Sequence, residues 1–103
     1  MKVVWSKEAL QRLLDIEEYI AEDNVTKAIE FTDFLVSQSL KIEDNPKIGR
    51  VIPEFGDEDI RELLIKGYRL VYRPGAGRID ILTVFEGHRR IRRNEIFDDE
   101  EQL

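Results

Sequence analysis

Residues 60–85 limit the possible folds most narrowly, because they read as three short strands joined by two tight turns. The apolar runs Ile60–Ile65 and Tyr68–Arg73 are separated only by Lys66-Gly67, and a two-residue connection of this kind is typical of a β-hairpin. The turn Pro74-Gly75-Ala76-Gly77 then leads into a third run, Arg78–Phe85. The pattern predicts a mainly antiparallel sheet.

The first half of the chain predicts a strand and two helices. Lys2–Trp5 is a short apolar run suited to a strand, and apolar residues at helical spacing follow from Ser6, a suitable N-cap, to about Glu22. A second helical pattern runs from about Val25 to Ile42, and a loop covers Lys47–Asp59. The expected fold is α+β, with the N-terminal strand and an α-helical hairpin packed on a mainly antiparallel twisted sheet.

The length and the residue types exclude several classes of protein. The 103 residues suit one domain, which we place at residues 1–97, followed by an acidic C-terminal tail at 98–103. The chain has no cysteine, and its sequence shows no metal-ligand spacing and no glycine-rich phosphate loop, so we expect no metal and no cofactor. No apolar run reaches membrane-spanning length. We therefore expect a cytoplasmic protein without a membrane partner.

Charge is divided unevenly along the chain. Residues 60–93 hold nine Lys and Arg against three acids, a net charge of +6. Since the whole chain has a net charge of −6, the remaining residues carry −12. Cations gathered on a sheet form either a solvated face or a surface for phosphates or an acidic partner. The candidates for contact with a nucleic acid or another target are Arg61, Lys66, Arg73, Arg90, Arg92 and Arg93.

Four other residues could carry chemistry or bind bases. His88 is the only histidine, so it could act as a general acid or base, although a surface histidine in a basic turn is the alternative. Glu54 could be a general base, or an ordinary loop glutamate. Tyr68 and Tyr72 could stack on bases, but tyrosines that share one face of a central strand more often belong to the core.

Three segments together resemble one family. The succession GRVIPEFGDEDIREL, GYRLVYR and a strand ending in EGHRR is similar to the RelE/ParE superfamily of bacterial type II toxin–antitoxin toxins, which includes plasmid stabilisation proteins. The resemblance covers essentially the whole chain. It implies the small α+β toxin fold and a cognate antitoxin that wraps the toxin with a helix and an extended segment. An acidic or amphipathic antitoxin segment is expected to cover the basic sheet.

The superfamily has two branches with different activities. RelE-like members cut messenger RNA on the ribosome without a metal, whereas ParE-like members are associated with blocking DNA gyrase. By resemblance, Arg69 and Arg89 match two arginines of the nuclease branch. Phe97, however, stands where the nuclease has a tyrosine, and Arg61-Glu62 stands in the region of its lysine pair. A phenyl ring can stack on a base but cannot transfer a proton.

These departures favour ParE-like, non-nucleolytic growth inhibition through DNA gyrase. The alternative is a RelE-like, ribosome-dependent mRNA endonuclease in which Arg69 and Arg89 stabilise the developing charge and His88 moves a proton. A second alternative is a non-toxic module that only binds its partner.

Overall fold

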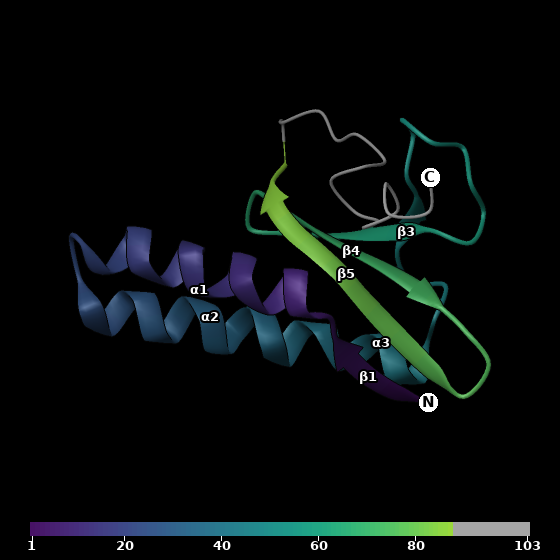
Figure 1. The fold of residues 1–103 in the computed structure, drawn as a ribbon, viewed down its shortest axis with the longest axis horizontal. Coiled ribbons are helices and arrows are strands. Elements are labelled where there is room, and N and C mark those ends of the chain that lie inside the picture. The colour runs from purple at the N-terminus through teal and green to yellow at the C-terminus, as the bar shows by residue number, and fades with distance from the viewer. Residues whose placement is uncertain (88–103) are drawn as a thin grey trace.

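The computed structural model describes residues 1–87, and it shows a five-stranded mixed sheet with a helical hairpin on one face (Figure 1). The elements are β1 (Lys2–Trp5), α1 (Lys7–Ala21), α2 (Val25–Ser39), α3 (Lys41–Asp44), β2 (Arg50–Val51), β3 (Arg61–Ile65), β4 (Tyr68–Pro74) and β5 (Arg78–Glu86). The strand order is β1-β5-β4-β3-β2. Strand β1 runs parallel to β5, and the other neighbours are antiparallel. The predicted α+β fold is confirmed.

Two boundaries differ from the sequence prediction. The second helix ends at Ser39 rather than Ile42, because the N–H of Leu40 bonds to the carbonyl of Ser37. The short helix α3 follows, with Ile42 buried. The predicted loop at 47–59 contains a strand of two residues, β2, which pairs with the start of β3. The predicted tail at 98–103 lies outside the described residues.

Polar side chains fix where the helices begin. The hydroxyl of Ser6 accepts a hydrogen bond from the N–H of Ala9 at 3.0 Å and donates one to the carbonyl of Leu82 at 3.1 Å. This N-cap therefore ties the start of α1 to β5. Asn24 caps α2 in the same way, since its side-chain oxygen accepts from the N–H of Lys27 at 2.9 Å.

The two faces of the sheet carry separate apolar clusters. The main core lies between the sheet and the helices and includes Leu35, Leu70 and Tyr72. A smaller cluster on the opposite face consists of Ile52, Ile60, Val71, Leu82 and Phe85, with Phe55 packed against it. Tyr72 is a core residue with no exposed surface, as the second interpretation of this tyrosine predicts. Within residues 1–87, no helix is long and apolar enough to span a bilayer.

Candidate functional site

A network of two arginines and two glutamates lies on the sheet beside the smaller cluster. Arg69 of β4 donates from Nε to Glu62 Oε1 at 2.5 Å, and from Nη1 and Nη2 to the two oxygens of Glu54 at 2.8 and 2.7 Å. Glu62 Oε2 accepts from Arg50 Nε at 2.6 Å. We call Arg50, Glu54, Glu62 and Arg69 the arginine–glutamate network.

The strand register places these side chains together. Arg50 of β2 is directly opposite Glu62 of β3, and Arg69 is two residues from the position opposite Glu62 on β4. Arg69 is in turn opposite Phe85 of β5, and its guanidinium carbon lies 5.3 Å from the centre of that ring. Glu54 comes from the loop before β3. The network therefore joins β2, β3 and β4 to this loop, and Arg69 extends the contact to Phe85 of β5.

The network is almost closed to solvent, and its central cation stays charged. The side chain of Glu62 is fully buried, and that of Arg69 is 5% exposed. The pKa of Arg69 is raised, chiefly by its hydrogen bonds to Glu54 and further by those to Glu62, although burial opposes the shift. A buried carboxylate needs cations at its oxygens, and Glu62 has one at each. Arg69 can therefore hold the loop on the sheet but cannot exchange protons near neutral pH.

Tyr72 anchors the start of the same loop from the core side. Its hydroxyl donates to the carbonyl of Pro46 at 2.7 Å and accepts from the N–H of Gly49 at 2.8 Å. A Cβ on Gly49 would lie 2.5 Å from the carbonyl oxygen of Glu62 and 2.8 Å from the Tyr72 hydroxyl, so the approach requires glycine. Burial raises the pKa of Tyr72. The loop is thus held at residues 46–49 and again at Glu54.

The structure brings some predicted site residues together and separates others. Arg69 and Glu54 are in contact, and the predicted role of Glu54 as a general base stays a prediction. Arg61 donates to the carbonyl of Gly49 at 2.8 Å, Lys66 lies 4.6 Å from the ring centre of Phe34, and Arg73 is half-buried at the end of β4. The predicted residues outside the described part of the chain are His88, Arg89, Arg90, Arg92, Arg93 and Phe97.

Sequence reasoning missed two members of the network. Glu62 was read only as part of the Arg61-Glu62 pair, and Arg50 was not singled out. A signal did exist, because a carboxylate in the middle of an apolar strand is costly to bury without a cation. Among residues 1–87, no group of three or more His, Cys, Asp or Glu is placed to hold a metal ion.

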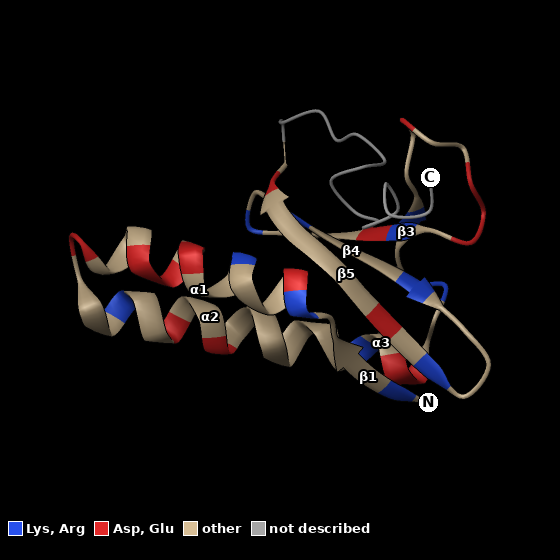
Figure 2. Cartoon of the chain, in the orientation of Figure 1, with Lys and Arg blue, Asp and Glu red and all other residues tan. Residues whose placement is uncertain are grey.

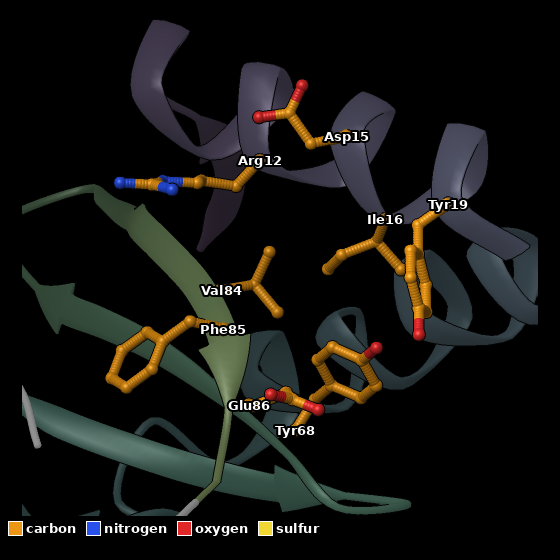
Figure 3. A pocket seen from close by; sticks show the side chains of 8 residues that line it. All are labelled: Arg12, Asp15, Ile16, Tyr19, Tyr68, Val84, Phe85 and Glu86. Carbon is orange, nitrogen blue, oxygen red and sulfur yellow. The ribbon is translucent and has the colours of Figure 1, made fainter. Parts of the chain in front are cut away.

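A groove of about 360 Å³ separates α1 from the ends of β4 and β5 (Figure 3). Its lining consists of Arg12, Asp15, Ile16 and Tyr19 from α1 and Tyr68, Val84, Phe85 and Glu86 from the strands. We call it the tyrosine groove. The ring of Tyr68 also packs on Phe31 of α2, with 5.3 Å between ring centres. The pKa of Tyr68 is raised by burial first, then by Glu86 and Tyr19.

A second groove, between α1 and α2, is apolar with acidic sides. Its volume is about 390 Å³, and its apolar lining is Leu14, Ala21, Val25, Ala28 and Ile29. Asp15, Glu17 and Glu18 also line it, and Figure 2 shows acids recurring along α1. We call it the hairpin groove. Large apolar residues exposed on the two helices include Leu10, Leu14, Val25, Ile29 and Val36. Such exposed apolar surface is typical of a protein-binding site.

Comparisons with known proteins agree with this architecture. A family model described as "ParE toxin of type II toxin-antitoxin system, parDE" matches residues 3–91. The fold is similar to a solved structure from the "Chromosomal ParDE TA system from P. aeruginosa", with a TM-score of 0.71 and 20% sequence identity. That match covers 84% of this chain and 95% of the other. A comparison with curated protein sequences finds no match.

Proposed function

Since the chain belongs to the ParE toxin family of type II toxin–antitoxin systems, we propose that it stops growth by inhibiting DNA gyrase, without cutting messenger RNA. Family membership confirms the predicted resemblance to RelE/ParE toxins and the predicted class of function, a type II toxin. It also supports an antitoxin as partner. The choice between gyrase and ribosome-bound mRNA is the step that we add.

The burial of Arg69 is the main support for gyrase, rather than messenger RNA, as the target. Arg69 matches the arginine that the nuclease branch uses at the scissile phosphate, but here its donors are bonded to Glu54 and Glu62. A phosphate would have to displace Glu54 from a site that is almost closed to solvent. It would also compete for the cation that Glu62 needs in its buried position. Arg69 is therefore better suited to holding the fold than to catalysis.

The region of the missing lysine pair supports the same conclusion. Arg61 is bonded to the backbone of Gly49, and Glu62 is a fully buried anion. Neither replaces a mobile lysine beside a substrate phosphate. The RelE-like alternative now depends on His88 and Arg89, which lie outside the described residues, and on Phe97 being dispensable.

Two assays on the same protein separate the hypotheses. Purified toxin should abolish supercoiling of relaxed plasmid by DNA gyrase, and toxin mixed with equimolar antitoxin should leave supercoiling intact. Messages from cells induced without antitoxin should keep their 5′ ends. New ends at a fixed codon position, with supercoiling unaffected, would instead establish the nuclease. Unimpaired growth after induction would leave only the partner-binding module.

The hairpin groove supports a docking site for the antitoxin's helix. The repeat of apolar residues at i and i+4 on α2, Val25 with Ile29, suits an amphipathic helix laid between α1 and α2. The extended antitoxin segment expected on the sheet would then follow from one end of that helix. The basic sheet as its site stays a prediction, since four of the cations concerned lie beyond residue 87.

A further inference from the structure

The tyrosine groove combines an apolar floor, two phenol rings and two carboxylates. Ile16 and Val84 form buried surface at its base. The hydroxyl ends of Tyr19 and Tyr68 point toward one another, and Asp15 and Glu86 also line the groove (Figure 3). A pocket with this lining suits a ligand that has an apolar stem and a flat cationic end.

The negative charge of the groove is not cancelled by its own residues. Arg12 is the one cation in the described lining, and its Nε is already bonded to Glu8 at 2.7 Å. Asp15 accepts a hydrogen bond from a neutral donor, Gln11 Nε2, at 2.9 Å. The pKa of Tyr68 is raised by burial first and then by Glu86 and Tyr19, and both causes disfavour a further anion in the groove. The groove thus favours a cation.

Arginine fits this chemistry better than lysine. A guanidinium is planar and can stack on a tyrosine ring while its N–H groups reach a carboxylate. Its three methylene groups can cover the apolar floor formed by Ile16 and Val84. Lysine carries a compact and strongly hydrated charge, which an open groove lined by aromatic rings binds less tightly.

The position of the groove indicates which protein supplies the arginine. Asp15 lines both the tyrosine groove and the hairpin groove, so only helix α1 separates the two. A segment that lies in the hairpin groove and passes over α1 at Asp15 would deliver a side chain to the tyrosine groove. A second copy of this chain is a poor occupant, because residues 7–23 carry six acids against two bases and two such surfaces would repel each other.

We propose that the tyrosine groove binds an arginine side chain of the antitoxin, next to the helix that occupies the hairpin groove. This inference rests on the toxin–antitoxin assignment but not on the action on gyrase. Glu86 pairs with the guanidinium, and Tyr19 and Tyr68 enclose it (Figure 3). Asp15 adds negative charge at the other end of the groove, and α1 sets the distance between this arginine and the apolar residues of the same segment.

The first test uses N-acetyl-arginine amide as probe and N-acetyl-citrulline amide as its neutral isostere. Titrated into the full-length toxin up to roughly 100 mM, as suits a fragment of this size, the arginine probe should shift the ring resonances of Tyr19 and Tyr68 saturably. The citrulline probe should not. Equal shifts by both probes, or no saturable shift by arginine, would overturn the proposal.

Variants then locate the charge. Glu86→Gln should weaken arginine binding by about two- to fivefold, the range for partly exposed ion pairs. Asp15→Asn should weaken it less, because the Asp15 carboxylate lies at the other end of the groove (Figure 3). Glu22→Gln, which removes an acid just beyond α1 but outside both grooves, should leave it unchanged. A loss with Glu22→Gln equal to that with Glu86→Gln would mean that only net charge matters, and the site would be wrong.

The final test uses the natural partner. Each arginine of the co-purified antitoxin is replaced by alanine, and binding is measured to wild-type toxin and to Glu86→Gln. Replacing one of these arginines should cost at least about twofold less affinity against Glu86→Gln than against wild type. If every arginine loses the same factor against both toxins, the proposal fails. Supercoiling inhibition by free Glu86→Gln toxin is read separately, so a failure of the gyrase proposal leaves this result intact.

Discussion

Glu62 and Arg69 form an ion pair between β3 and β4 in which both partners are buried, with side chains 0% and 5% exposed. Their contact explains how a strongly acidic chain keeps a carboxylate inside its sheet. It also means that a loss of toxicity in an Arg69 variant has two possible origins, chemistry and unfolding. Stability must therefore be measured before such a variant is read as catalytic.

Arg69→Ala should lower the free energy of unfolding by about 3–5 kcal/mol, because it removes one of the two cations at buried Glu62. Chemical denaturation followed by circular dichroism gives the value. Arg78→Ala breaks the more exposed pair with Asp80 and serves as the control, with little change expected. Replacing both partners, as Arg69→Met with Glu62→Leu, should recover much of the loss. A fully stable Arg69→Ala protein would contradict the role of the network.

Tyr72→Phe should lower the free energy of unfolding by about 1–3 kcal/mol, because the buried Gly49 N–H and the partly buried Pro46 carbonyl lose their partner. Tyr19→Phe is the matched control, since that side chain is 71% exposed. Thermal unfolding of the three proteins under one set of conditions compares them. Equal melting temperatures for Tyr72→Phe and wild type would show that the hydroxyl does not hold the loop.

Gly49→Ala should destabilise the protein by about 1–3 kcal/mol, because the added methyl group would overlap the backbone of Glu62 and the ring of Tyr72. Gly75→Ala is the control, as its Cβ would meet its nearest atom, the Arg78 carbonyl oxygen, at 3.4 Å. Urea denaturation distinguishes the two. If both substitutions are tolerated equally, the close approach at residue 49 is not required.

Stability should fall as the pH rises above about 10, the ordinary pKa of tyrosine. The pKa values of Tyr68 and Tyr72 are raised in the folded protein, mainly by burial, so the unfolded chain releases these protons first. The stability that these two tyrosines contribute is therefore fully present below the pKa of the unfolded chain, and it is lost as the pH rises through the pKa of the folded protein. Unfolding free energies measured from pH 8 to 12 give the slope, and Tyr68→Phe should reduce it. An unchanged slope would mean that Tyr68 ionises alike in both states.

Ile29→Glu should weaken antitoxin binding at least about fivefold, because it puts a charge into the hairpin groove at a side chain that is 49% exposed. The folded toxin should keep its stability. Leu64→Glu tests the sheet, where the extended segment is expected, because Leu64 is 55% exposed on β3 and away from both grooves; its loss should be the smaller of the two. Calorimetric titration with the antitoxin measures both. A larger loss with Leu64→Glu would move the docking site to the sheet.

Local patterns predicted most of the fold. The Lys66-Gly67 turn defined β3 and β4, and helical spacing with Ser6 as N-cap defined α1. The place of β1 beside β5 could not be predicted, because any open edge would have accepted it. The contact of Glu54 with Arg69 was also out of reach. It joins residues 15 positions apart through a loop whose path depends on Tyr72 and Gly49.

The parallel pairing of β1 with β5 also has a kinetic meaning. Lys2 pairs with Arg78, 76 positions later, so β1 finds its neighbour only after nearly all of the described chain has been synthesised. Contacts this distant in sequence slow folding and cannot form on a nascent chain that still lacks β5. Translation itself thus delays the completion of the sheet until β5 has been made.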